Sequence, residues 1–185
     1  MWIWICVILA AVVTDQVTKQ LAVRFLAGGD SVEVIPCIFR FTYVENRGAA
    51  FGMLADHRWV FMIISSVAIV ALLIYLWKFR PASKWACTAL SLIIGGGIGN
   101  MIDRVLLNYV IDFLDFCAFP TLWVWVFNVA DACVCVGGGI LLVWCIVSMI
   151  GEVKANKKTE PTASAPSDAD GSEPDTSRET EHDGE

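Results

Sequence analysis

Histidine is scarce in this sequence. The only two are His57 and His182, and the second lies in a polar carboxyl-terminal stretch. No H-E-x-x-H motif occurs, which excludes the common zinc-protease arrangement. With so few histidines, a Ser-His-Asp triad is not expected. None of the seven cysteines forms a C-x-x-C motif, so the sequence indicates no metal site and no cofactor. A basic surface pattern is also missing, which argues against nucleic acid as a partner.

The cysteines themselves are spread along the chain. Five of the seven fall in apolar segments, and we interpret them as small buried apolar residues. The remaining two, Cys37 and Cys117, lie outside these segments, so a disulfide between them is left open.

The net negative charge of the chain comes from its carboxyl-terminal tail and not from the folded part. The formal charge is −6, but residues 1–150 contain nine acids and nine bases, whereas residues 151–185 contain ten acids and four bases. From Lys157 onward, Ser, Thr, Pro, Asp and Glu dominate and apolar residues are almost absent, which is typical of disorder. We therefore expect a folded domain over residues 1–150 and a disordered, acidic cytoplasmic tail over residues 151–185.

The folded part is unusually apolar. Hydrophobic residues make up 57% of the chain, against roughly 45–50% in soluble domains. A helix needs roughly 20 apolar residues to cross a bilayer. Four long apolar runs have about this length or more, and they cover residues 2–26, 59–77, 85–107 and 122–150. The predicted fold is an all-α membrane protein, a bundle of four transmembrane helices with a small extracytoplasmic β-rich region between the first and second helices.

The first run contains a polar patch in its second half. A secretory signal peptide is an alternative interpretation of this run, but a basic n-region and a small-residue cleavage site are missing. Within the patch, Asp15 and Lys19 are four residues apart and would share one helix face, where they can form an ion pair. On these residues alone, a purely structural salt bridge stays possible.

The segment over residues 27–57 is polar enough to leave the membrane. Ile38 to Glu45 alternates between aromatic and other residues, a pattern that predicts a strand with one aromatic face. The strand runs into the sequence ENRGAAFG, whose small residues allow a close approach of the backbone or simply a hairpin turn.

Basic residues predict the orientation in the membrane. Lys78, Arg80 and Lys84 lie in the short loop between the second and third runs, and Lys154, Lys157 and Lys158 follow the fourth. Short basic loops stay in the cytoplasm, so we expect both termini to be cytoplasmic.

This orientation brings polar residues from separate segments to one level near the outer face. At a rise of about 1.5 Å per residue, the polar positions of the first, third and fourth runs all fall in the outer part of the bilayer. Ionisable groups at such depth are functional candidates. The charged and amide residues of the later segments are Asn100, Asp103, Arg104, Asp112, Asp115, Asn128 and Asp131.

Paired carboxylates are the chemistry that remains. Two close carboxylates do not both ionise easily, so their pKa values separate. One can then act as a base on water while the other, protonated, polarises a carbonyl group. Three other interpretations stay open on the residues alone: helix caps with interfacial solvation, a small transporter or proton channel, and a non-enzymatic scaffold. A transporter usually shows repeats or interrupted helices at the midplane, and we find no repeat.

Five blocks carry a more specific indication. They are DQVTK from Asp15, NRGAAFG from Asn46, GGGIGNMIDR from Gly95, VIDF from Val110 and FNVAD from Phe127. In this order, and across the whole of residues 1–150, they resemble the lipoprotein signal peptidases, also called signal peptidase II, which are aspartyl proteases of the bacterial inner membrane. The acidic tail is not part of the family pattern.

The resemblance implies roles for individual residues. Asp112 and Asp131 would be the catalytic dyad, while Asp115 falls outside the dyad motif and is kept as a nearby acid. Residues implied to bind substrate or line the site are Asn46, Gly48, Gly96, Asn100, Arg104 and Asn128. Residues implied to support it are Asp15, Lys19 and Asp103.

The resemblance also implies the reaction. Enzymes of this family remove the signal peptide of a prolipoprotein by cutting on the amino side of a cysteine that already carries diacylglycerol. The expected partners are therefore diacylglyceryl-prolipoproteins and membrane lipid. We expect a monomer in the bacterial cytoplasmic membrane, with its active site near the outer face.

Overall fold

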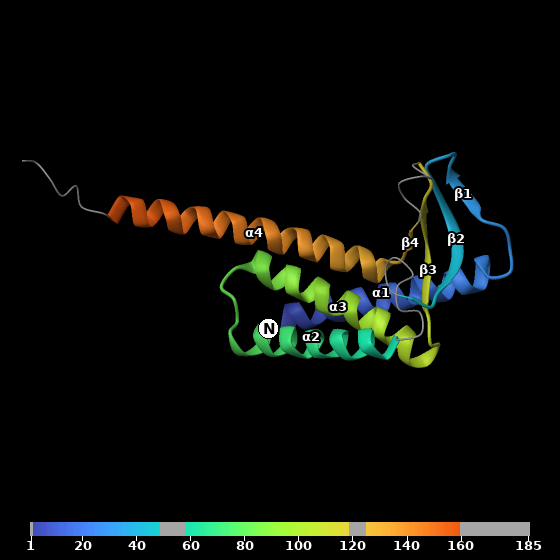
Figure 1. Ribbon diagram of the computed structural model, residues 1–185, viewed down its shortest axis with the longest axis horizontal. Coiled ribbons are helices and arrows are strands. Elements are labelled where there is room, and N and C mark those ends of the chain that lie inside the picture. Colours follow the sequence, from blue (N-terminus) through green and yellow to red (C-terminus); the bar gives the residue numbers. More distant parts are fainter. Residues whose placement is uncertain (1, 49–57, 119–124, 160–185) are drawn as a thin grey trace, which may run out of the picture.

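The computed structural model describes residues 2–48, 58–118 and 125–159, which contain four helices and four strands. The helices are α1 (Trp2–Leu26), α2 (Arg58–Lys78), α3 (Lys84–Leu106) and α4 (Val129–Thr159). The strands are β1 (Val32–Ile35), β2 (Phe39–Asn46), β3 (Val110–Phe116) and β4 (Val126–Phe127). The helices form an elongated bundle, and the strands stand across one end of it (Figure 1).

The helices have the character expected of a membrane protein. By length and composition, α1, α3 and the Val129–Lys154 part of α4 can each cross a bilayer. The apolar stretch Met62–Lys78 of α2 is shorter. Large apolar side chains such as Leu9, Val67 and Val143 are exposed on the outer faces of the bundle, and extensive exposed apolar surface marks a membrane or partner contact. A fourth span formed by α2 stays a prediction.

The fourth helix differs from the predicted run over residues 122–150. It begins at Val129, because Val126 and Phe127 form β4 instead of a helical turn. At its other end α4 continues to Thr159, so the residues directly after Ile150 are helical, although we had assigned them to the disordered tail. Residues 160–185 lie outside the described residues.

All four strands belong to one antiparallel sheet in the order β1-β2-β3-β4. The predicted aromatic strand is confirmed as β2: the rings of Phe39 and Phe41 are 5.2 Å apart, and Phe39 also lies 5.0 Å from Phe116 of β3. Residues 110–116 lie between the predicted runs over residues 85–107 and 122–150, where no strand was predicted. They form β3 instead, because β2 supplies a hydrogen-bonding partner that is distant in the sequence.

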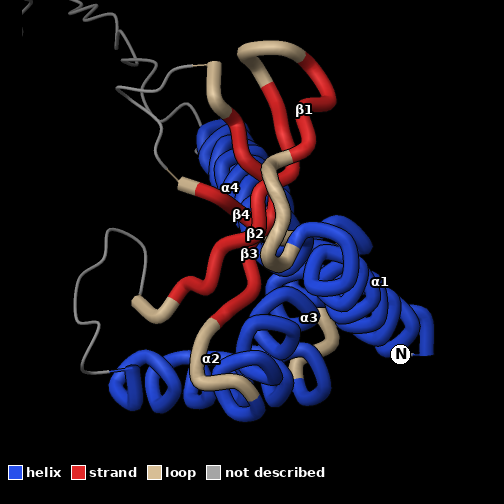
Figure 2. The backbone as a smooth tube through the Cα atoms, turned by 90° about the vertical axis from the view of Figure 1, so that its right-hand side faces the viewer, coloured by secondary structure: helices blue, strands red, loops and turns tan. Residues whose placement is uncertain are grey.

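A sharp turn leads from α3 into this strand. Asn108 adopts a left-handed conformation, with φ of 70°, directly after the C-cap residue Leu107. Asparagine is one of the few residues besides glycine that tolerate this conformation at a helix end. The turn brings β3 back against the end of α3, and Figure 2 shows the strands in front of α4 and to one side of α1, with α2 lying away from them.

Two apolar clusters lie at different levels of the molecule. The first contains Ile8, Leu76, Cys87, Leu90 and Ile94, and the second contains Ala22, Leu26, Ile111 and Phe113. Along α1, Asp15 and Lys19 fall between Ile8 and Ala22, and both are fully buried. A polar layer therefore separates the two clusters, and this layer holds the candidate site.

Candidate active site

Polar side chains from five elements meet in the layer between the two apolar clusters. They come from α1, β2, α3, β3 and α4, and they are Asp15, Gln16, Lys19, Asn46, Asn100, Asp103, Arg104, Asp112, Asn128 and Asp131. Their positions agree with the convergence expected from the sequence. Their catalytic and supporting roles stay predictions at this point.

Asp112 occupies a buried position in β3, where it is 2% exposed. Each of its carboxylate oxygens accepts a hydrogen bond from an amide: Asn46 Nδ2 donates to Oδ2 at 2.9 Å and Asn128 Nδ2 donates to Oδ1 at 2.6 Å. Pairing of β2 with β3 explains the first contact, because Val44 lies opposite Asp112 and Asn46 follows two residues later on the same face.

The surroundings of Asp112 change its proton affinity. Burial raises the pKa of Asp112 to about 6, the amide hydrogen bonds from Asn46 and Asn128 oppose this change, and the negative charge of Asp131 adds to it. Desolvation disfavours the charged form of a carboxylic acid, as does a neighbouring carboxylate. Asp112 therefore holds a proton at a higher pH than an exposed aspartate does.

Asp131 lies in the first turn of α4 and is only partly buried. Its backbone N–H donates to Asn128 Oδ1 at 2.9 Å, and its Oδ2 accepts from the Asn128 backbone N–H at 3.3 Å. This reciprocal pair is a capping box built from Asn and Asp. The other oxygen, Oδ1, accepts from Asn100 Nδ2 at 2.7 Å. Because the amino-terminal end of a helix carries partial positive charge, this position favours an ionised carboxylate.

A chain of amides connects the two carboxylates. Asn128 Nδ2, which donates to Asp112, also donates to Asn100 Oδ1 at 3.1 Å. Asn100 in turn donates to Asp131. The order Asp112–Asn128–Asn100–Asp131 is therefore continuous, and it holds both carboxyl groups in one site.

Lys19 and its partners lie next to this chain. The ion pair between Lys19 and Asp15 that the sequence predicts is confirmed, with Nζ 2.9 Å from Asp15 Oδ2. The same Nζ is 2.9 Å from Asp103 Oδ2 and donates to Asn100 Oδ1 at 2.9 Å. The three predicted supporting residues thus form one buried ionic cluster.

Three predicted lining residues have more specific positions. Arg104 donates from Nη1 to the Asn100 carbonyl at 3.2 Å, and its charge interacts with Asp131, Asp112 and Asp103. The backbone N–H of Gly48 donates to Asn46 Oδ1 at 3.1 Å, which fixes the amide that reaches Asp112. Gly96 instead lies at the contact of α3 with α4, where a Cβ atom would collide with the carbonyl oxygen of Ala130.

Gln16 is a member of the network that the sequence analysis did not single out. Its Nε2 donates to Asp103 Oδ1 at 2.9 Å, to the Gly99 carbonyl at 3.2 Å and to Asp15 Oδ2 at 3.3 Å. Its place beside Asp15 in the polar patch of the first run was the available signal.

Asp115 belongs to a different set of contacts. Its Oδ2 lies 2.6 Å from Arg40 Nε and also accepts from the Thr42 hydroxyl at 3.2 Å. The β2–β3 register pairs Arg40 directly with Asp115. Asp115, which falls outside the predicted dyad motif in the sequence, thus also has different contacts from Asp112 and Asp131 in the structure. Both Cys37 and Cys117, between which a disulfide was left open, are free thiols.

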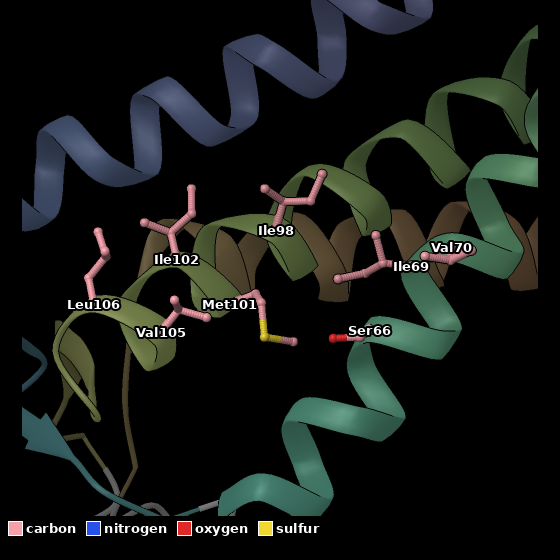
Figure 3. Close-up of a pocket in the computed structure, with 8 residues that line it drawn as sticks. All are labelled: Ser66, Ile69, Val70, Ile98, Met101, Ile102, Val105 and Leu106. Atoms are coloured by element: carbon pink, nitrogen blue, oxygen red, sulfur yellow. The ribbon is translucent and has the colours of Figure 1, made fainter.

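The polar network also differs from the apolar grooves on the bundle. A groove of about 380 Å³ lies between α2 and α3 (Figure 3) and is lined by Ser66, Ile69, Val70, Ile98, Met101, Ile102, Val105 and Leu106. None of the predicted site residues lines it. In the described part of the chain, no cluster of three or more His, Cys, Asp or Glu side chains is placed to hold a metal ion.

Comparison with known proteins places the chain in a family. The sequence pattern of the family "Signal peptidase (SPase) II" matches residues 7–147. The chain belongs to the signal peptidase II family. The matched region contains all of the polar residues described above, and it ends before the acidic tail.

Individual members of the signal peptidase II family are similar over most of their length. A lipoprotein signal peptidase of Halothermothrix orenii is 41% identical over 138 residues, which cover 75% of this chain and 91% of the relative. One from Caldanaerobacter subterraneus is 46% identical over 137 residues, covering 74% and 91%. A solved bacterial membrane enzyme, determined by the in meso method at 2.3 Å resolution, is 32% identical with a TM-score of 0.72, covering 88% of this chain and 95% of the other.

Proposed function

We propose that Asp112 and Asp131 are the catalytic pair with which this signal peptidase activates water and cleaves its substrates. As a member of the signal peptidase II family, the chain is an aspartic peptidase that removes signal peptides from prolipoproteins. The observation that carries the proposal is the continuous amide chain from Asp112 through Asn128 and Asn100 to Asp131, because it holds two carboxyl groups in one site.

The two carboxyl groups have different surroundings, which suggests different roles. Asp131 is less buried than Asp112 and lies at a helix amino terminus with donors on both oxygens, so we assign it the role of the ionised member of the pair. Asp112 is buried, and burial raises its pKa to about 6, so it holds the shared proton. This division is the usual arrangement when two close carboxylates share a single proton.

The reaction then follows from these protonation states. Asp131 removes a proton from water, and the water oxygen attacks the carbonyl carbon of the scissile peptide bond while Asp112 donates its proton to the carbonyl oxygen. In the resulting tetrahedral intermediate, Asp131 gives its proton to the leaving nitrogen and the C–N bond breaks. Asp112 recovers a proton from the hydroxyl group as the new carboxyl group forms. Both aspartates return to their starting states.

The substrate bond and the membrane orientation are parts of the same proposal. The family resemblance supports cleavage on the amino side of a diacylglyceryl-cysteine. The basic connection between α2 and α3 supports cytoplasmic termini and a site near the outer face. Catalysis is proposed to need only residues 1–150.

Single-turnover cleavage of a diacylglyceryl-cysteine signal peptide by purified variants tests the proposal. Asp112→Asn and Asp131→Asn should each fold and insert but lose cleavage by several orders of magnitude, because an amide cannot accept or deliver the proton. Asp115→Asn is the matched control in β3 and should be much milder, since Asp115 contacts Arg40 instead. A metal chelator should have no effect. Substantial activity in either dyad variant, or loss with chelator alone, would refute the assignment.

A further inference from the structure

Lys19 is the centre of a buried cluster whose members contact the backbone next to both proposed catalytic aspartates. Its side chain is about 1% exposed, and lysine is almost never buried so completely unless it is paired. Asp15, Asp103 and Asn100 each place an oxygen 2.9 Å from Nζ. An ammonium group has three N–H donors, so Lys19 is fully satisfied by three side chains from α1 and α3.

Two of these partners hold the backbone next to a proposed catalytic residue. Asp15 Oδ1 accepts from the backbone N–H of Ala130 at 2.9 Å, and Ala130 directly precedes Asp131. Asp103 Oδ2 accepts from the backbone N–H of Ile111 at 3.1 Å, and Ile111 directly precedes Asp112. The third partner, Asn100, donates to the Asp131 carboxylate itself at 2.7 Å.

We propose that Lys19 is a positioning residue that fixes the two catalytic aspartates relative to each other. Lys19 holds Asp15 and Asp103 in place. Asp15 accepts a hydrogen bond from the backbone N–H of Ala130, just before Asp131, and Asp103 accepts one from the backbone N–H of Ile111, just before Asp112. This inference rests on the proposed function of Asp112 and Asp131. Lys19 does not touch either carboxylate directly, so its effect passes through its three partners.

The charges of the cluster explain why Lys19 is needed. Without its ammonium group, Asp15 and Asp103 would be two carboxylates close together in a buried site, where like charges repel each other strongly. If Asp15 and Asp103 moved apart, their hydrogen bonds to the backbone N–H groups of Ala130 and Ile111 would weaken. A misplacement of about 1 Å in an active site can cost about 100-fold in rate, so a small change in the separation of β3 from α4 is sufficient to matter.

Close packing around Asp15 supports the same interpretation. A Cβ atom on Gly99 would lie 2.5 Å from Asp15 Oδ2, so glycine at this position leaves room for the carboxylate between α1 and α3. Gln16 adds donors to Asp103, to Asp15 and to the Gly99 carbonyl. The carboxylates of Asp15 and Asp103 are therefore held in fixed positions by several neighbours.

The first test compares Lys19→Met with the triple variant Lys19→Met/Asp15→Asn/Asp103→Asn. Lys19→Met leaves two unpaired carboxylates, and we expect kcat to fall by about 100-fold with KM within about threefold of wild type. The triple variant removes all three charges but keeps an amide oxygen for each backbone N–H, so kcat should recover by at least about tenfold. Wild-type kcat in Lys19→Met, or no recovery in the triple variant, would overturn the proposal.

A second comparison remains informative even when Lys19→Met does not fold. Asp15→Asn keeps an oxygen that can accept from the Ala130 N–H, whereas Asp15→Leu does not, and in both variants Lys19 keeps Asp103 as its partner. We expect kcat of Asp15→Asn to exceed that of Asp15→Leu by at least about tenfold. Equal values would overturn the positioning role.

Asp112→Asn and Asp131→Asn, measured in parallel, separate this inference from the proposed function. If both keep their activity, the dyad assignment fails whatever Lys19 does. If both lose activity while Lys19→Met keeps the wild-type kcat, only the positioning role fails.

Discussion

Two carboxyl groups in one site can divide the chemistry only when their surroundings differ. Asp112 is surrounded by β2, β3 and the N-cap of α4 and is almost fully buried. Asp131 lies partly exposed in the first turn of α4, where backbone and amide donors favour a negative charge. The roles of acid and base that we propose follow from this difference.

The pH dependence of cleavage should report the proton on Asp112. Burial raises its pKa from an ordinary value near 4 to about 6, so the proton is kept below about pH 6 and lost above it. Because the protonated form is the proposed acid, kcat/KM should fall as the pH rises through about 6 to 7, and should also fall in acid when Asp131 becomes protonated. The two apparent pKa values belong to the pair. A rate that rises steadily from pH 5 to 9 would contradict this division of roles.

At this scale the sequence predicted most of the residues that form the polar network. The polar residues stood out because they interrupt long apolar runs, and the i, i+4 spacing of Asp15 and Lys19 predicted their ion pair, which the structure confirms. Gln16 was missed because a neutral amide beside a charged residue is also common on solvent-exposed helix faces. Its three acceptors come from both α1 and α3, and that contact is visible only once the helices are packed.

The elements, rather than the single residues, were harder to predict. β3 forms by pairing with β2, about 70 residues earlier in the chain, as in the pair Arg40 and Asp115, and local patterns carry no information about such pairing. The start of α4 was placed too early because residues 122–127 are as apolar as the helix that follows. Asn128 and Asp131 form the capping box that determines the true start.

The N-cap of α4 is predicted to have two separable functions. Asn128 caps the helix with its Oδ1 and donates to Asp112 with its Nδ2. Asn128→Ser keeps a good capping oxygen but loses the amide donor, whereas Asn128→Ala loses both. Thermal unfolding should show Asn128→Ala less stable than Asn128→Ser by about 1 kcal/mol. Both should lose about 2-fold to 10-fold in cleavage rate, since Asp112 is the protonated member of the pair and a hydrogen bond between neutral groups contributes about 0.5–1.5 kcal/mol. Full activity in Asn128→Ser would show that the donor is dispensable.

The close contact between α3 and α4 should depend on glycine at position 96, because glycine has no Cβ atom. A Cβ atom there would collide with the Ala130 carbonyl oxygen and approach Val134 Cγ2 to 2.9 Å. Gly96→Ala should therefore displace the start of α4, destabilise the fold by about 1–3 kcal/mol and lower kcat.

Gly138→Ala, also within a helix, is the matched control for Gly96→Ala, because nothing lies within 4 Å of its Cβ position. It should leave activity unchanged and stability equal or higher by up to about 1 kcal/mol. Equal effects of the two substitutions would argue against a packing role for Gly96.

On the scale of the whole molecule, the sheet and the basic connection lie at opposite ends of the bundle (Figure 1). Lys78, Arg80 and Lys84 flank the turn between α2 and α3, whereas the polar network is at the sheet end. If basic connections stay in the cytoplasm, the network lies near the outer face.

Reporter fusions can check this orientation. A reporter inserted near Arg80, or fused after Gly151, should indicate the cytoplasm, and one near Asp30, in the turn before β1, should indicate the outside. A fusion near Trp59, at the start of α2, should also report the outside when α2 crosses the membrane as predicted. An extracytoplasmic signal from the Arg80 fusion would contradict the orientation and the outward position of the site.

The central claim is that Asp112 and Asp131 act as one catalytic unit, and a double-mutant cycle tests it most directly. Single-turnover cleavage of a diacylglyceryl-cysteine signal peptide is measured for wild type, Asp112→Asn, Asp131→Asn and the double variant. Residues that act as a unit are strongly non-additive, so we predict that each single variant loses several orders of magnitude and that the double variant is hardly slower than either. Losses that multiply in the double variant, or a single variant that retains substantial cleavage, would contradict the account.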